Sequence, residues 1–459
     1  MTKSLFGKAA LFAALVLVSA PLKAESLADA LVSAYKNSNL LEQNRALLRA
    51  ADEDVAQAFA AMRPVINYVL AAQRDYSSAP FQDGSKLRDT ASLSISADML
   101  LWDFGGTRKG IEIAREAVLA TREGLQQVEQ GVLLTAVQAY MNVIRASEFV
   151  ALRQSNLELI DQELKSAQDR FSLGELTRTD VALAEARRAV SEANLAAAQG
   201  DLLAAREDYK AATGHYPKGL NPAPQTPALP KTLKEALALA QQTHPSLKQA
   251  QHQVKLAELA IERSKTAIKP RLTGGLQVGV DGEGTQGAGV NLRLSGPIYQ
   301  GGQLASQIRK AIANRDAARS SLLQTAVQVD QAVAQAWVRR DVARAQLEAV
   351  EGQIRAARVA FRGVRDEAAL GARTTLDVLT AEQDLLDAEA ARISANADLY
   401  ISTYALLAEI GLLNAQHLGL SVPIYDVSAY SNAVGNAPVK YVSPEGKKLD
   451  AILKGLGKN

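Results

Sequence analysis

Two hydrophobic periods alternate along the chain, and each predicts one kind of element. Over 26–62, apolar side chains such as Leu27, Leu31 and Ala34 recur every three or four residues, as on one face of an α-helix. Pro64 ends the pattern, because the residue before a proline is displaced from helical backbone angles. The spacing therefore predicts one helix over 26–62.

Strict alternation of apolar and polar residues follows this helix. Leu93 and Ile95, for example, alternate with serines. A period of two over about ten residues is that of a strand with one apolar and one polar face. Two such runs predict a β-hairpin over about 65–104, which Gly105 and Gly106 close.

The helical period then returns over longer segments. It predicts helices over 107–172 and 180–213, and no proline interrupts either of them. At about 1.5 Å per residue, the first of these helices is on the order of 100 Å long.

The whole order of elements then repeats. A second set of patterns predicts a helix over 232–269, a hairpin over about 271–297, and helices over 302–370 and 376–410. Three landmarks recur in the same order, namely a proline before the hairpin, a glycine pair after it and a glycine between the last two helices (Pro64 and Pro270, Gly105-Gly106 and Gly301-Gly302, Gly174 and Gly371). Such a match indicates an internal duplication.

The duplication sets the predicted organisation. The first structural repeat covers 25–213, a linker with five prolines covers 214–231, and the second repeat covers 232–420. We expect the tail, 421–459, to be irregular and partly disordered.

Each repeat carries a turn with the same sequence pattern. Gly174 and Gly371 can each end a helix in the left-handed conformation, and Asp180 and Asp377 can cap the helix that follows. Taken alone, each turn could simply connect two helices.

The N-terminus indicates export. Lys3 and Lys8 lead into an apolar run, and Ala24 is the most plausible cleavage position, so 1–24 is predicted to be a signal peptide. The alternative is an uncleaved anchor, although the run is shorter than the ~20 residues that span a bilayer.

Composition argues against several kinds of site. The formal net charge of +2 gives no electrostatic footprint for nucleic acid. Cysteine is absent, and the four histidines lack the spacing of metal ligands. No nucleophile and base stand together, so we expect no catalytic residue, no metal and no cofactor.

The four predicted strands are too few to close a barrel in one chain, since the smallest membrane barrels have about eight. If their apolar faces meet lipid, several chains must share one barrel, because open edges leave backbone groups unpaired. The alternative is a small soluble sheet that caps a coiled coil.

The chain resembles the TolC family of outer-membrane channel proteins over nearly all of the sequence that follows the predicted signal peptide. The resemblance is carried by the duplication, the two prolines, the two turns and the run Ile298-Tyr299-Gln300-Gly301-Gly302. It implies a homotrimer with a 12-stranded β-barrel, four strands per chain, on a long periplasmic α-helical barrel. The implied location is the outer membrane of a Gram-negative bacterium, with an extension into the periplasm.

The resemblance also implies roles for residues of the turns, which form the periplasmic entrance in this family. Arg373 is expected to form a latch with Thr179 and Asp180, and Asp377 is expected to ring the constriction. Two positions depart from the family pattern, because Thr380 replaces a frequent second ring acid and Ala368 replaces a gate tyrosine. Plain helix capping is the alternative role for both aspartates.

We therefore predict an outer-membrane exit duct of a tripartite efflux or type I protein secretion system. Its implied partners are a periplasmic adaptor, an inner-membrane RND or ABC transporter and outer-membrane lipid. The alternative function is a periplasmic coiled-coil adaptor or scaffold without a membrane barrel; a soluble enzyme would need a site that the sequence does not show.

Overall fold

Two copies of one series of elements make up most of the protein. The computed structural model describes residues 24–81, 84–224, 226–436 and 444–455. Each copy consists of two short helices, two strands, a very long helix and a shorter one. The first copy comprises α1 (Leu27–Asn37), α2 (Asn39–Ala60), β1 (Val65–Tyr76), β2 (Leu87–Trp102), α3 (Gly106–Ser172) and α4 (Arg178–Thr213). The second comprises α5 (Leu233–Thr243), α6 (Pro245–Thr266), β3 (Arg271–Asp281), β4 (Gln286–Ser295), α7 (Gln303–Ala369) and α8 (Thr375–Ile410).

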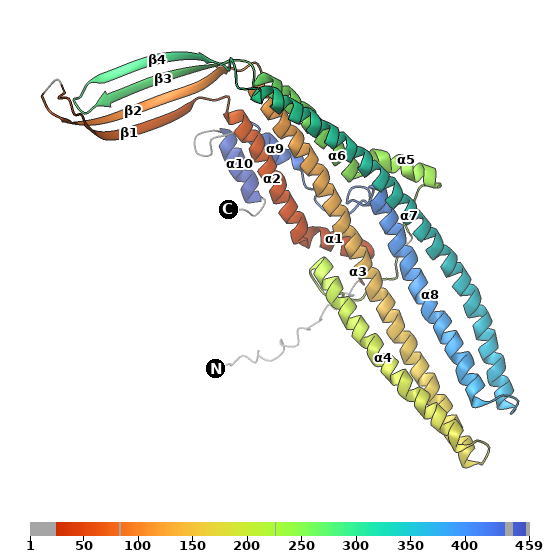
Figure 1. The fold of residues 1–459 in the computed structure, drawn as a ribbon. Coiled ribbons are helices and arrows are strands. Elements are labelled where there is room, and N and C mark those ends of the chain that lie inside the picture. Colours follow the sequence, from red (N-terminus) through yellow and green to blue (C-terminus); the bar gives the residue numbers. More distant parts are fainter. Residues whose placement is uncertain (1–23, 82–83, 225, 437–443, 456–459) are drawn as a thin grey trace, which may run out of the picture.

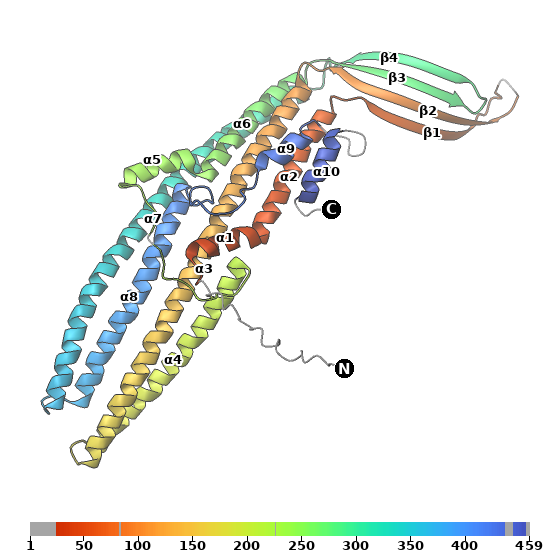
Figure 2. The ribbon, with the colours of Figure 1, turned by 180° about the vertical axis from the view of Figure 1, so that it is seen from behind.

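Corresponding helices of the two copies have equal lengths, 11, 22, 67 and 36 residues. The molecule is elongated, with all four strands at one end and the α3–α4 and α7–α8 turns at the other (Figure 1). The shorter helices α2 and α6 flank the strand-proximal parts of the long helices, and the view from behind shows the same arrangement (Figure 2). Within the described residues, no helix combines the length and the apolar character that a membrane crossing requires.

The prediction of one helix over 26–62 is wrong, because the chain breaks between α1 and α2. Ser38 adopts extended backbone angles, and its hydroxyl accepts a hydrogen bond from the Leu41 amide at 3.2 Å. This bond satisfies one of the free donors of the new helix.

The prediction of one helix over 232–269 is wrong for a related reason. Pro245 is the first residue of α6, and a proline disfavours helical angles at the residue before it. That residue, His244, caps α6 by accepting a hydrogen bond from the Ser246 amide at 3.2 Å.

The tail is also more regular than predicted. It contains α9 (Val427–Val434) and α10 (Pro444–Gly455). Tyr430 and Val434 are buried against Ala56 of α2, and apolar residues of α10 pack on the same cluster. The predicted signal peptide, by contrast, lies outside the described residues except for Ala24.

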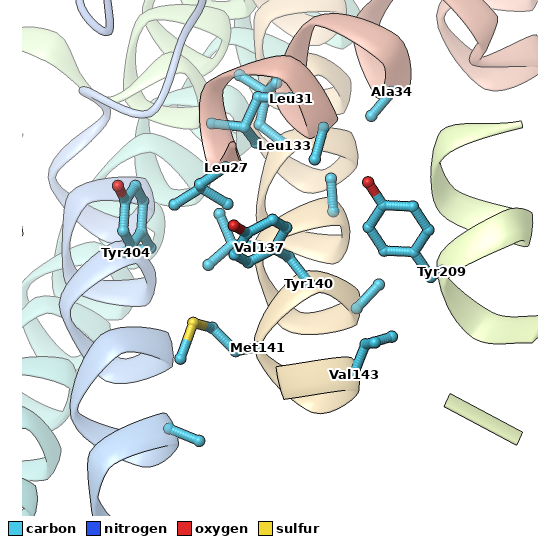
Figure 3. Close-up of a cluster of buried hydrophobic side chains, with 14 of the residues drawn as sticks. Leu27, Leu31, Ala34, Leu133, Val137, Tyr140, Met141, Val143, Tyr209 and Tyr404 are labelled. Carbon is cyan, nitrogen blue, oxygen red and sulfur yellow. The ribbon is translucent and has the colours of Figure 1, made fainter. Parts of the chain in front are cut away.

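The main core lies at mid-length and joins the two copies. Figure 3 shows Leu27 and Leu31 of α1 next to Leu133, Val137 and Tyr140 of α3, with Tyr209 of α4 and Tyr404 of α8 on either side. Tyr140 is fully buried, and its hydroxyl donates to the backbone carbonyl groups of Asn221 at 2.7 Å and Glu25 at 3.2 Å. These bonds tie the linker and the start of α1 to the long helix.

The four strands form one antiparallel sheet in the order β1-β2-β3-β4. The pairing of β2 with β3 joins the two copies, and β1 and β4 are the edges. Residues directly opposite each other share a face, so the register places Tyr68, Ile95, Val278 and Ala288 in one row. The same face holds further apolar residues in the neighbouring rows (Ile66, Leu70, Leu93, Leu276, Val290, Leu292).

This apolar face is not covered by any described part of the chain. Tyr68 and Val290 are 80% and 78% exposed, although both are large and apolar. The opposite face carries Ser94, Gln277 and Asn291. The sheet is therefore amphipathic and needs an apolar environment that the described part of the chain does not supply.

Candidate functional site: the paired helix turns

The two turns at the strand-distal end have nearly the same backbone. Gly174 and Gly371 have φ angles of +78° and +77°, in the left-handed region that glycine adopts most readily. Each follows a 67-residue helix and precedes a 36-residue one. The geometry is that of a glycine-terminated helix followed by a capped one.

Both aspartates of the turns take part in capping boxes. The Asp180 carboxylate accepts hydrogen bonds from the Thr177 hydroxyl at 2.7 Å and its amide at 3.0 Å. Asp377 makes the same pair of bonds with Thr374, at 2.8 Å and 3.0 Å. The capping role proposed as an alternative is thus present in the structure.

These bonds also fix the charge of the two carboxyl groups. The Thr177 hydroxyl and amide hold the pKa of Asp180 below its ordinary value. The Thr374 amide and hydroxyl do the same for the pKa of Asp377, and Arg373 adds a favourable charge. Both groups therefore stay ionised at neutral pH, and both are partly exposed to solvent.

A cleft of about 720 Å³ lies between the turns, and residues of α3, α4, α7 and α8 line it. Asp180 and Arg373 are both on its wall, so the structure brings these two predicted residues to one place. Ala368 lines the same cleft.

In the single chain, Arg373 pairs with Glu367 and not with the predicted partners Thr179 and Asp180. Its Nε donates to Glu367 Oε2 at 2.8 Å, and this contact raises the pKa of the guanidinium. Among the described residues, no hydrogen bond or ion pair joins Arg373 to Thr179 or Asp180. The latch predicted from the resemblance stays a prediction.

Thr380 has a local role. Its hydroxyl donates to the Leu376 carbonyl at 2.8 Å, within its own helix. It adds no carboxylate next to Asp377.

Two polar contacts between the hairpins α3–α4 and α7–α8, on the turn side of the main core, were missed by the sequence reasoning. Arg365 of α7 forms an ion pair with Glu163 of α3 at 3.6 Å. Asn156 of α3 donates to Glu382 of α8 at 2.7 Å. Glu382 could have been found, since it continues the apolar spacing of α8 that runs through Leu379 and Leu386.

The predicted landmarks at the strand ends have clear local roles. Pro64 and Pro270 directly precede β1 and β3. Gly105 and Gly302 are the N-cap residues of α3 and α7, with φ angles of +89° and +86°, next to Gly106 and Gly301. Within the described ranges, no cluster of three or more histidine or acidic residues could hold a metal ion.

Comparison with known proteins gives consistent results over nearly the whole chain. The family model described as outer membrane efflux protein matches residues 30–215 and 236–412. The outer membrane efflux protein BepC of Brucella suis is 34% identical over 456 residues, which cover 97% of this chain and 98% of BepC. The outer membrane protein TolC of Escherichia coli is 26% identical and aligns with 94% of this chain and 90% of its own length.

Solved structures show the same fold. The structure of CusC superposes with a TM-score of 0.76 at 18% sequence identity, covering 84% of this chain and 92% of CusC. The fold class predicted for each chain, mainly helical with a four-stranded antiparallel part, is confirmed by this likeness.

Proposed function

Because the chain belongs to the outer membrane efflux protein family and is an outer-membrane exit duct of an efflux or secretion system, we propose that three copies join their sheets into one 12-stranded barrel. The uncovered apolar face of the four-stranded sheet is the observation that carries this proposal. Strands of 10 to 16 residues are long enough for a tilted membrane crossing. The edge strands β1 and β4 would pair between copies, and this pairing would remove the open edges that lipid does not tolerate.

The four long helices of each copy would build the wall of a periplasmic tunnel. A 67-residue helix extends on the order of 100 Å, so the turns lie far from the membrane that holds the strands. We propose that these turns form the entrance and meet a periplasmic adaptor and an inner-membrane transporter of the RND or ABC type. The transporter would then select the cargo, and the duct needs no catalytic residue or cofactor.

We further propose that Arg373, Thr179 and Asp180 latch the entrance. Arg373 and Asp180 already line one cleft, and the ionised Asp180 carboxylate is a suitable acceptor for a guanidinium. In the closed latch, the Arg373 guanidinium would donate to the Thr179–Asp180 pair, for which Glu367 is a competing acceptor.

Membrane extraction and affinity purification test the assembly. The full-length protein should stay with outer membranes during washes with high salt and carbonate, and detergent should release a trimer. Purification of a tagged copy should retain the adaptor and the transporter. Release of the protein by carbonate alone would favour the alternative of a scaffold without a barrel.

Asp377→Asn should weaken the block of channel conductance by multivalent cations several-fold. Three carboxylates around one axis attract cations and raise their local concentration, whereas three amides do not. The amide oxygen still accepts a hydrogen bond from Thr374, so the variant removes the charge and keeps most of the cap.

Planar-bilayer recordings with and without a trivalent cation measure this effect. Thr380→Asp is the opposite variant, because it adds a second carboxylate one turn along α8 and should strengthen the block. An undiminished block in Asp377→Asn would remove this residue from the constriction.

A further inference from the structure

Glu382 is a buried carboxylate on the helix that follows the second turn. Its side chain lies among the core-facing residues of α8, and the residue is only 4% exposed. It follows Asp377 by five positions, which is about 8 Å along a helix. A buried carboxyl group so close to the turns requires an explanation, since an isolated buried charge is costly.

One oxygen of this carboxyl group is held by a chain of polar side chains. Asn156 Nδ2 of α3 donates to Glu382 Oε1 at 2.7 Å. The Ser191 hydroxyl of α4 donates to Asn156 Oδ1 at 3.1 Å, and Ser191 is itself buried. This series of hydrogen bonds thus runs from α8 through α3 to α4. It connects the two helical hairpins whose turns form the proposed entrance.

The other oxygen, Oε2, is buried and has no hydrogen-bond partner among the residues that the structure describes. The charged groups around Glu382 come from three further helices. Glu163 of α3 opposes its ionisation, while the Asn156 hydrogen bond, Arg187 of α4 and Arg365 of α7 favour it. Burial has the largest effect and raises the pKa of Glu382 to about 7.

We propose that Glu382 is a positioning residue of the entrance, which holds the α7–α8 hairpin against α3–α4 through Asn156, and that the packed arrangement of the two hairpins is more stable when Glu382 is protonated. The inference rests on the proposed location of the entrance at the turns. Under this proposal the entrance has two contacts, the exposed latch of Arg373 and the buried hydrogen bond of Glu382.

The direction of the pH effect follows from the two environments of the carboxyl group. When the hairpins are together, the pKa of Glu382 is raised to about 7; when they part, water restores it toward the ordinary 4.5. The packed arrangement therefore binds the proton more tightly. Its added stability is complete below about pH 4.5, decreases as the pH rises and is lost above about pH 7. Opening should become easier over this range, by up to a factor on the order of a few hundred in the opening equilibrium of each copy.

Bilayer conductance of the purified full-length trimer, recorded between pH 5 and pH 8, tests the proposal. Wild-type conductance should rise with pH, whereas Glu382→Gln should keep the low acid value throughout, since its amide does not ionise. Glu389→Gln is the matched control, because Glu389 lies on the same helix and pairs with Arg358 inside its own hairpin at 2.9 Å. It should retain the wild-type profile.

A wild-type pH profile in Glu382→Gln would overturn the inference. If that variant forms no trimer, Glu382→Met offers a second test, because it fills a similar volume without an ionisable group and should give the same flat profile. Arg373→Ser, recorded under the same conditions, distinguishes a failure of the Glu382 proposal from a failure of the proposed entrance latch. Raised conductance in Arg373→Ser together with a wild-type profile in both Glu382 variants would reject only the role of Glu382. Unchanged conductance in Arg373→Ser would reject the proposed entrance latch.

Discussion

Val290→Arg is expected to prevent insertion of the trimer into the outer membrane. Val290 lies near the middle of β4, on the apolar face, opposite Leu276. An arginine that faces lipid at the bilayer midplane costs about 2–4 kcal/mol, and each barrel would contain three of them. The amount of heat-resistant trimer in outer-membrane fractions measures the effect.

Asn291→Arg is the matched control for this prediction. Asn291 is the next residue of the same strand and lies on the opposite face, beside Gly275 and close to Asp98. In a barrel with its apolar face outward, this arginine would point into the lumen, so trimer yield should stay near the wild-type level. Equal loss in both variants would show that the two faces have the same environment, and the membrane barrel would then be wrong.

The contrast between these neighbouring residues shows why the fold class could be predicted from the sequence. The alternation that separates Val290 from Asn291 is a local property, and a period of two needs no knowledge of distant contacts. The duplication is also visible without a structure, because the Pro, Gly-Gly and Leu-Gly landmarks keep their order. The family confirms the fold class that these patterns indicated.

The helix breaks at Ser38 and His244 could not be read from hydrophobic spacing. The apolar residues continue at three and four positions on both sides of each break, so the period hardly changes. The signals that matter there are a capping side chain and Pro245, and each acts over only a few residues. The tail helices are short, and α9 depends on packing against α2.

The candidate site was predictable in its location but not in its contacts. Glycine and aspartate in each turn indicated the backbone geometry and the caps, which depend on neighbours in sequence. The partner of Glu382 is Asn156, 226 positions away, and no local pattern can identify such a pair. Arg373 illustrates a third case, since Glu163, Glu175 and Asp180 line the same cleft and the sequence alone cannot choose its partner among them.

Arg373→Ser is expected to raise the conductance of the purified trimer in planar bilayers several-fold. In the proposed latch, the guanidinium donates to Thr179 and Asp180, and a serine side chain is too short to bridge the same cleft. Loss of three such contacts should shift the entrance toward its open arrangement. High salt should reproduce part of the effect in the wild type, because ions screen an exposed charge pair.

Glu367→Gln distinguishes this latch from a brace within one turn. In the single chain, Glu367 is the partner of Arg373, with the two charged groups 2.8 Å apart and both half exposed. If Glu367 merely competes for the guanidinium, its removal frees Arg373 for Asp180, and conductance should stay low or fall. If instead the Arg373–Glu367 pair itself keeps the turn closed, both variants should open the channel equally. Equal opening would therefore contradict the latch and show that a contact within the α7–α8 turn of each copy keeps the entrance closed.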